Sequence, residues 1–175
     1  LRTHLIGAQL NDCWVGRADI VREGLSTLPW YRGARLDMVE RYGKSVALGF
    51  HKDGELRYAV AELGMTGLLL FRATETKHPQ HVHVRMSFTG GRESELRYWN
   101  PRRFGRLSLL DRPGLDRYCA RRFGVDPVTV PRDEFVRLMR ARRGRLKPLL
   151  MHQQVIAGIG NIYANEILFR TKLHP

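Results

Sequence analysis

Hydrophobic and polar residues alternate along several short stretches in the first two thirds of the chain. Val46, Leu48 and Phe50 alternate with small or polar residues, and residues 81–88 (HVHVRMSF) alternate strictly. A period of two is typical of a strand that turns one face to a core. For the second stretch we expect two faces, a core face with Val82, Val84, Met86 and Phe88 and an opposite face with His81, His83 and Arg85.

Turn signals separate these stretches from one another. Asp53-Gly54 predicts a two-residue hairpin turn between a strand over residues 45–50 and a returning strand over residues 57–63. Gly90-Gly91 predicts another turn, after which Leu96 and Tyr98 begin a further strand. Several short strands with turns between them favour a sandwich or barrel. We therefore predict an N-terminal β-sandwich domain over residues 1–112.

The hydrophobic period changes in the last third of the chain. Pro127 and Pro131 mark a linker, which we place at residues 113–131. Asp133 is expected to cap or open a helix, and helices are also predicted over residues 148–153 and 162–171. The first of these helices has the apolar residues Phe135, Val136, Leu138 and Met139, and the last has Ile162, Ile167, Leu168 and Phe169. The prediction is an α+β protein with a helical domain over residues 132–175.

The net charge of the chain indicates which class of partner it binds. The chain has 30 Lys+Arg against 17 Asp+Glu, a formal net charge of +13, yet its 43% hydrophobic content suffices for a core. This excess indicates a polyanionic partner, with nucleic acid ahead of an anionic membrane surface, because no basic amphipathic helix with a clean apolar face is evident. Two cysteines exclude a disulfide framework and a four-cysteine zinc site. We expect a soluble, cytoplasmic, nucleoid-associated monomer, without membrane contact, whose sequence is cut at both ends.

The segment GIGN at residues 158–161 is the most specific local feature. Two glycines allow a tight turn and a close approach to a ligand, and the N–H groups and positive dipole end of the next helix point into that turn. Such a terminus suits a phosphate oxygen, with Asn161 as a further donor and Arg143 and Lys147 as mobile charge. The alternative is an ordinary helix end, in which a C-cap glycine is followed by an Asn N-cap. The clustered arginines and lysines favour phosphate binding, since they repel one another unless an anion neutralises them.

Two apolar residues occupy glycine-rich segments. Met65 follows Gly64 and precedes Thr66-Gly67, and Phe104 lies between Arg103 and Gly105. An apolar side chain on such a loop is unfavourable in water, but it is reasonable if it enters a stack of nucleic-acid bases. Taken alone, these residues favour the alternative that both belong to the core at strand ends.

Five segments, which follow one another along the chain in the same order as in the family, resemble motifs of the formamidopyrimidine-DNA glycosylase / endonuclease VIII family. Residues 146–166 (LKPLLM to GIGNIYANE) are similar to its helix–two-turns–helix, and residues 100–105 (NPRRFG) to its DPRRFG loop. Residues 63–67 (LGMTG) resemble its LGMSG turn, residues 41–44 (RYGK) its RRAK strand start, and residues 81–84 (HVHV) its HxHV strand. The match covers nearly the whole chain.

The resemblance implies a bifunctional DNA glycosylase and AP lyase that acts on oxidised bases or abasic sites in double-stranded DNA. Met65, Arg102 and Phe104 would fill the gap left by a nucleotide rotated out of the helix, with Arg102 reaching the base left without a partner. Lys44 resembles a lysine beside the active site that transfers a proton during elimination; a phosphate-binding or solvated lysine is the alternative. His81 and Arg143 resemble DNA-contacting positions, so the predicted DNA-binding set is His81, Arg102, Arg143, Lys147, Gly160 and Asn161.

The resemblance also implies covalent chemistry, and the two residues that would perform it are not among those named above. In the family an N-terminal proline amine attacks the anomeric carbon of the sugar, and a neighbouring glutamate handles protons. That Pro-Glu start is expected immediately before Leu1, so we expect the chain as given to bind DNA without normal excision. We assign no metal to this chain; a zinc ion would belong to the family's C-terminal module, beyond Pro175.

One residue departs from the family pattern. The family often has histidine before Leu-Gly-Met, whereas this chain has Glu62. We expect Glu62 to pair with a nearby arginine or to face away from the DNA, and the change leaves open whether oxidised purines or pyrimidines are preferred. Two other functions compete with the repair enzyme. They are a DNA-binding helix–two-turns–helix module without catalysis and an RNA-binding protein.

Overall fold

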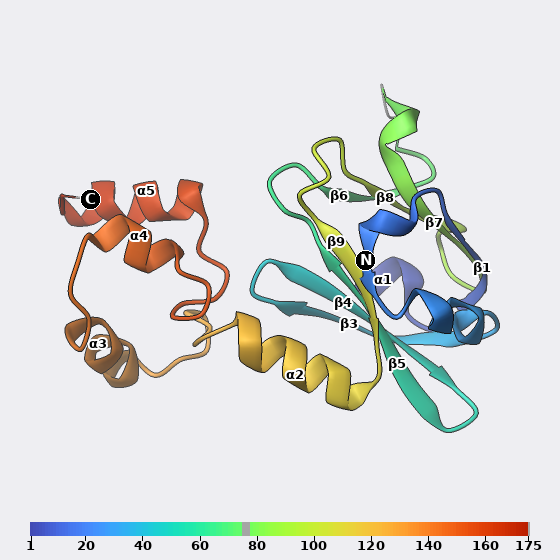
Figure 1. Ribbon diagram of the computed structural model, residues 1–175, viewed down its shortest axis with the longest axis horizontal. Helices are drawn as coiled ribbons and strands as arrows, with labels where there is room; N and C mark the ends of the chain where they lie inside the picture. Colours follow the sequence, from blue (N-terminus) through green and yellow to red (C-terminus); the bar gives the residue numbers. More distant parts are fainter. Residues whose placement is uncertain (75–77, 175) are drawn as a thin grey trace. The chain divides into compact units, whose positions relative to one another are not determined.

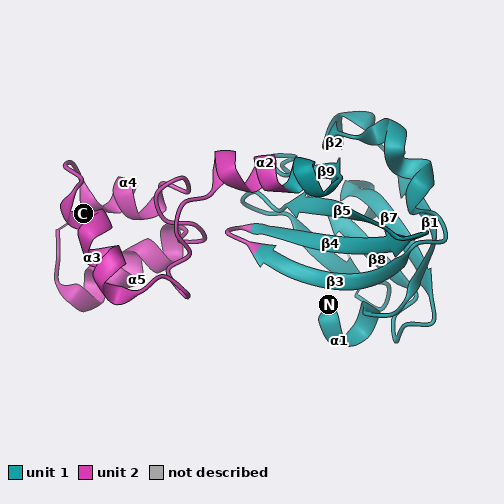
Figure 2. Cartoon of the chain, turned by 90° about the horizontal axis from the view of Figure 1, so that it is seen from below, with its two compact units in different colours: residues 1–41, 45–115 teal, residues 42–44, 116–175 magenta. Residues whose placement is uncertain are grey.

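The chain divides into two compact units (Figure 2), in a computed structural model that describes residues 1–74 and 78–174. Unit 1 contains Leu1–Arg41 and Ser45–Leu115, and unit 2 contains Tyr42–Lys44 and Asp116–Pro175. The hairpin tip Tyr42–Lys44 thus groups with the helical unit, although the strands that it joins belong to unit 1.

A helix, α2 (Arg112–Arg122), occupies the first half of the segment predicted as a linker. Pro113 lies in the first turn of this helix, where proline is tolerated because its missing N–H would have no helical partner. The Asp111 carboxylate accepts a hydrogen bond from the Gly114 N–H at 2.7 Å, as a helix cap does. The sequence interpretation relied on Pro127 and Pro131 and missed this start signal.

The described residues of unit 1 form one nine-stranded sheet in the order β2-β9-β5-β4-β3-β1-β7-β8-β6 (Figure 1). Apart from the parallel pair β2 and β9, the strand pairs with a described register are antiparallel. The strands are β1 (Gln9–Val15), β2 (Val21–Glu23), β3 (Arg35–Tyr42), β4 (Ser45–Lys52), β5 (Glu55–Glu62), β6 (Leu68–Phe71), β7 (Val82–Thr89), β8 (Glu95–Trp99) and β9 (Arg106–Leu110). A short helix, α1 (Arg2–Leu5), precedes the first strand, and η1 (Ala18–Ile20), η2 (Leu25–Tyr31) and η3 (Pro79–His81) lie between strands.

The sheet curls so that its two halves pack face to face. Strands β5 and β8 are five places apart in the sheet order, which in a flat sheet would separate them by about 24 Å. Instead, the Tyr98 hydroxyl on β8 lies 2.6 Å from the Glu62 carbonyl oxygen on β5. The rings of Phe50 and Phe88 stack with centroids 6.4 Å apart across the same interior. The sandwich is therefore one curled sheet around a core, and the α+β prediction is confirmed.

The predicted alternation in β7 is confirmed on its core face and wrong at one position opposite. Val82, Val84, Met86 and Phe88 are all buried. His83 is only 5% exposed, because its ring Nε2 lies 3.0 Å from the Asn100 carbonyl oxygen and is enclosed there. The register shifts between Val82 and Val84, as at a β-bulge, which re-aims a side chain locally.

Strand β4 was expected to be half-buried, but both of its faces are covered. Ala47 and Gly49 are buried along with Leu48 and Phe50. A Cβ built at Gly49 would lie 3.0 Å from Met38 and 3.5 Å from the Tyr58 ring, so neighbouring strands cover the face that was expected to meet water.

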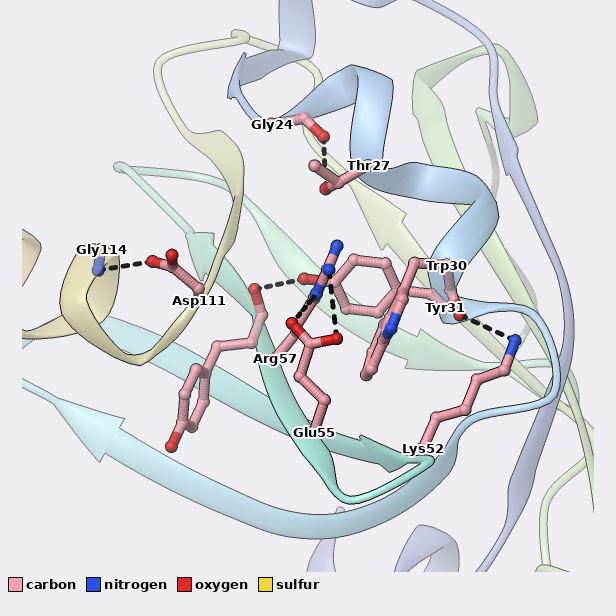
Figure 3. Close-up of polar contacts among 10 residues, drawn as sticks. Gly24, Thr27, Trp30, Tyr31, Lys52, Glu55, Arg57, Asp111 and Gly114 are labelled. Carbon is pink, nitrogen blue, oxygen red and sulfur yellow. Dashed lines mark hydrogen bonds and ion pairs between the residues drawn. The ribbon is translucent and has the colours of Figure 1, made fainter.

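The predicted Asp53-Gly54 hairpin turn is confirmed. Both residues have positive φ (51° and 77°), as the two central residues of a type I′ turn require, and Lys52 pairs with Glu55 across it. Just beyond this turn, the Arg57 guanidinium stacks 4.6 Å from the Trp30 ring centroid and pairs with Glu55 at 2.8 Å (Figure 3). The contact of Arg57 with Trp30 fastens the end of η2 to β5, and the ion pair with Glu55 lies within β5.

Unit 2 contains the rest of α2 together with α3 (Arg132–Arg140), α4 (Leu146–Met151) and α5 (Asn161–Thr171). Its core contains Leu150, Val155, Ile156, Ile159, Ala164 and Leu168. Ala164 and Leu168 form the buried stripe of α5, whereas Ile162 and Phe169 are 77% and 82% exposed. The prediction that all four apolar residues of this helix form one set is therefore wrong for these two.

The start of α3 lies one residue before Asp133. Pro131 occupies the cap position without a side-chain hydrogen bond, and Asp133 lies in the first turn, where a negative charge suits the helix dipole. Asp133 thus opens the helix without capping it. Within residues 1–74 and 78–174, none of the helices is long and apolar enough to cross a membrane.

Candidate nucleic-acid interface

Two loops at one end of the sheet in unit 1 expose apolar side chains. Met65, in the turn after β5, is 72% exposed, and Phe104, just before β9, is 58% exposed. The alternative that both residues belong to the core is therefore wrong. The loops touch, because a Cβ built at Gly64 would lie 3.2 Å from the Phe104 Cβ and 2.8 Å from the Gly105 nitrogen. Only glycine fits at position 64, which also has a φ of +63°.

Arg102 completes this group. Its guanidinium carbon lies 4.8 Å from the Phe104 ring centroid, a cation–π contact that holds the two side chains against each other. The structure therefore brings together Met65, Arg102 and Phe104, as the sequence analysis predicted. We call these three residues the wedge group. An apolar pair beside a cation suits insertion between bases next to a phosphate backbone.

His81 lies next to the start of the Arg102 loop. Its ring packs edge-on against Trp99, with centroids 6.0 Å apart, and its carbonyl oxygen accepts the Asn100 N–H at 2.9 Å. His81 is half-buried at the end of η3. The hydrogen bond from the Asn100 N–H therefore joins His81 to the residue at which the Arg102 loop begins.

A buried polar chain beneath the two loops escaped the sequence analysis. The Tyr98 hydroxyl donates to the Glu62 carbonyl at 2.6 Å and accepts from the Asn100 side-chain amide at 2.8 Å. Burial raises the pKa of Tyr98 to about 12, since desolvation disfavours the phenolate more than the Asn100 amide stabilises it. The Glu62 carboxylate lies 3.6 Å from the Arg22 guanidinium, which confirms the expectation that it pairs with an arginine.

In unit 2 the turn between α4 and α5 is held by a single glutamine. The Gln153 amide nitrogen donates to the carbonyl oxygens of Met151 and Ile159, at 2.8 and 2.9 Å, and its oxygen accepts the Gly158 N–H at 2.9 Å. Gly158 has a φ of +98°, which glycine adopts without strain. Sequence reasoning singled out the glycines and missed Gln153, whose only signal is a long amide inside a glycine-rich turn.

Helix α5 begins immediately after this turn. Gly160 occupies the cap position, Asn161 is the exposed first helical residue, and no described side chain caps this end. The alternative in which Asn161 is an N-cap is therefore wrong. The first N–H groups of a helix have no partner inside it and carry the positive end of its dipole. This end can accept an anion.

Lys44, from the hairpin tip, lies over the same helix end. A Cβ built at Gly160 would be 3.5 Å from the Lys44 Nζ, in ordinary van der Waals contact. Burial lowers the pKa of Lys44 below its usual value, because desolvation disfavours the ammonium form. Unit 2 therefore unites Lys44, Gly160 and Asn161, a group that we call the anion site.

The remaining predicted cations lie elsewhere in unit 2. Lys147 lines a hollow with Asn165, Arg170 and Lys172, alongside the later turns of α5. Arg143 is exposed in the segment between α3 and α4. Within the described residues, His, Cys, Asp and Glu side chains form no cluster of three or more that would hold a metal ion.

Comparisons with known proteins identify the family. Residues 1–107 match the model of the formamidopyrimidine-DNA glycosylase N-terminal domain, and residues 123–175 match that of the formamidopyrimidine-DNA glycosylase H2TH domain. A formamidopyrimidine-DNA glycosylase of Thermomicrobium roseum is 39% identical over 158 residues, covering 82% of this chain and 53% of its own length. One of Herpetosiphon aurantiacus is 39% identical over 118 residues, covering 66% of this chain and 42% of its own length.

A solved structure has the same fold. The Lactococcus lactis Fpg bound to DNA containing N7-benzyl-Fapy-dG superimposes with a TM-score of 0.82 at 24% identity, over 98% of this chain and 63% of that one. The chain spans about half the length of the curated relatives that it matches. The two family models together cover both units, and the chain belongs to the formamidopyrimidine-DNA glycosylase family.

Proposed function

We propose that this chain is the DNA-gripping and lesion-probing part of a base-excision DNA glycosylase that recognises oxidised bases or abasic sites in double-stranded DNA. The observation that carries the proposal is the exposed wedge group, with Met65 and Phe104 on touching loops and Arg102 stacked on Phe104. The names of the curated relatives and the damaged DNA bound by the Lactococcus lactis protein support the same function.

The wedge group would act when a nucleotide leaves the duplex. A glycosidic carbon inside the base stack is out of reach, so the nucleotide must rotate outward first. Met65 and Phe104 would then fill the vacated space, and Arg102 would offer its donors to the base left opposite. Unstacking costs about a few kcal/mol, which new protein contacts offset.

The anion site would grip the DNA backbone. Helix N–H groups and a nearby ammonium bind a phosphate oxygen without reading sequence. Lys44 would add a second role there: desolvation lowers its pKa below the usual value, which is the direction that a proton-transferring amine needs. We assign it phosphate binding and proton transfer during strand elimination.

The covalent step would need an amine nucleophile that these residues do not include. In the proposed reaction a proline nitrogen preceding Leu1 bonds to the anomeric carbon as the glycosidic bond breaks and the damaged base leaves. Opening of the C1′–O4′ bond of the sugar then gives the iminium, which permits loss of a C2′ proton and elimination of the 3′-phosphate. The family resemblance implies a zinc ion in a C-terminal module, and the proposed reaction routes no step through it.

The first experiment uses the 175-residue chain itself. We expect tighter binding to a duplex containing tetrahydrofuran, an abasic-site analogue, than to the matched intact duplex. A 2-aminopurine base opposite the analogue should change its fluorescence when the wedge group enters. Equal affinity for both duplexes would refute lesion probing, and tighter binding to structured RNA would favour an RNA-binding protein.

The second experiment tests catalysis. The chain is extended by its own upstream coding sequence and incubated with abasic duplex and borohydride, which reduces an iminium to a stable adduct. A covalent protein–DNA adduct is expected. An extended protein that binds the abasic duplex but forms no adduct would be a DNA-binding module without lyase activity.

A further inference from the structure

The two loops of the wedge group leave the sheet at one buried point. The Met65 loop follows Glu62 at the end of β5, and the Phe104 loop follows Tyr98 and Asn100 at the end of β8. The Tyr98 hydroxyl donates to the Glu62 carbonyl at 2.6 Å and accepts from the Asn100 side-chain nitrogen at 2.8 Å. Tyr98 is only 3% exposed and Asn100 is fully buried, so water does not compete for these bonds.

The direction of these hydrogen bonds follows from simple counting. A tyrosine hydroxyl has one proton, and the Glu62 carbonyl can only accept, so that proton points to Glu62. The neighbour on the other side must therefore donate to the hydroxyl oxygen, which an amide nitrogen does and an ionised carboxylate does not. The family motif that residues 100–105 resemble begins with aspartate, whereas this chain has Asn100. With asparagine at position 100, the side-chain amide donates to the Tyr98 hydroxyl oxygen, and the single hydroxyl proton is left to donate to the Glu62 carbonyl.

The main chain of Asn100 is held as firmly as its side chain. Its N–H donates to the His81 carbonyl at 2.9 Å, and its carbonyl oxygen lies 3.0 Å from the His83 ring nitrogen. The start of the Arg102 loop is thereby fixed to the edge of β7. The Tyr98 hydroxyl carries this fixation across to β5, alongside the direct pairing of β9 with β5, in which Arg106 lies opposite Glu62.

Close packing leaves the two loops little freedom once the hydroxyl is in place. A Cβ at Gly105 would overlap the Glu62 carbonyl oxygen and the Tyr98 hydroxyl. The Gly67 N–H closes the Met65 turn on the Leu63 carbonyl at 2.8 Å. The Tyr98 hydroxyl therefore lies at the point where the two loops are packed together, beneath the exposed side chains.

We propose that Tyr98 and Asn100 are positioning residues, which lock the Met65 and Phe104 loops together so that the wedge group enters DNA as one preformed unit. This inference rests on the proposed function, since it concerns the wedge group. Neither residue needs to touch DNA. A preformed wedge loses less conformational freedom on insertion than two independent loops, so the lock favours the lesion complex over the intact one.

The test replaces the Tyr98 hydroxyl while keeping its ring. Tyr98→Phe is compared with Tyr31→Phe, because the buried Tyr31 hydroxyl also donates to a backbone carbonyl of β5, that of Tyr58 at 2.9 Å (Figure 3). That bond lies four residues, about 13 Å, along the strand from Glu62. The control removes the same chemical group, a buried hydroxyl that hydrogen-bonds to the same strand, at a point away from the loops.

The readout is the affinity for the tetrahydrofuran duplex divided by that for the intact duplex. We expect Tyr98→Phe to lower this ratio at least fivefold with affinity for the intact duplex within twofold, and Tyr31→Phe to leave the ratio within twofold. Asn100→Asp should lower the ratio as Tyr98→Phe does. An unchanged ratio in Tyr98→Phe, or equal losses in both tyrosine variants, would overturn the lock.

Amide hydrogen exchange on the free protein supplies a second readout. We expect Tyr98→Phe to speed exchange in residues 63–67 and 101–105 at least tenfold, with residues 45–52 unchanged. Unchanged exchange in both loops would also overturn the proposal. If the wild-type chain shows no preference for the tetrahydrofuran duplex, both the proposed function and the lock are refuted. A preference that Tyr98→Phe retains refutes the lock alone.

Discussion

Truncation of Phe104 should separate the stability of the free protein from its recognition of damaged DNA. The side chain is 58% exposed, so Phe104→Ala removes few internal contacts, and the free energy of unfolding should change by less than about 1 kcal/mol. A phenylalanine buries about 150–250 Å² when enclosed, so its exposed part offers roughly 90–140 Å² for burial between bases. At ~25 cal/mol per Å² this area is worth about 2.3–3.5 kcal/mol, or roughly a 40- to 300-fold loss of affinity.

The assay is fluorescence anisotropy with tetrahydrofuran and intact duplexes, alongside urea unfolding of the free protein. The matched control is Phe169→Ala, because Phe169 is also an exposed phenylalanine, 82% exposed on α5, outside the wedge group. Only Phe104→Ala should reduce the preference for the lesion duplex. Equal losses on both duplexes would refute the wedge role, and a stability loss of about 3 kcal/mol, typical of a core phenylalanine, would refute the exposure argument.

Three further outcomes follow from the same geometry. Lys147→Ala should lower the slope of log affinity against log salt by about 0.9 on duplex DNA, the value for one lost phosphate contact, and an unchanged slope would remove Lys147 from the interface. Asn161→Ala should weaken binding to the same extent on every duplex sequence. Gly105→Ala should destabilise the protein by about 1–3 kcal/mol in urea unfolding, because its Cβ would overlap the Tyr98 hydroxyl, whereas Gly160→Ala, with only an ordinary contact at 3.5 Å, should leave stability nearly unchanged. Since burial raises the pKa of Tyr98 to about 12, above the ordinary tyrosine value of about 10, the folded state favours the neutral phenol. That contribution is complete below pH about 10 and is lost as the pH rises towards 12, so the urea midpoint should fall over this window less steeply in Tyr98→Phe than in the wild type.

Local signals predicted the strands β4, β5, β7 and β8 and the helices α3, α4 and α5, but not the other described strands nor α2. The Asp53-Gly54 turn is a hairpin, because only a few residues tolerate two successive positive φ angles. The core face of β7 followed from its alternation. The interpretation failed where burial depends on distant neighbours. Gly49 is covered by Met38 and Tyr58, and Phe169 lies on the side of α5 opposite its core stripe.

The candidate site was predictable in its exposed parts only. Met65, Arg102 and Phe104 could be named from their loops and the family resemblance, and the GIGN turn from its glycines. Gln153, Tyr98 and Asn100 could not, because each acts through backbone groups of other segments. A sequence pattern says which side chains are available, but not which carbonyl oxygen each one will reach.

The sequence by itself determined the period of several elements, the Asp53-Gly54 turn, the net positive charge and the family. Tertiary structure alone decided that one sheet curls until Tyr98 meets Glu62, and that Lys44 lies against Gly160 from the other end of the chain. The physical reason is the range of the interactions. Periodicity and turn geometry depend on neighbours a few residues apart, whereas burial, a lowered lysine pKa and a shared hydrogen bond depend on segments that meet only when the chain has folded.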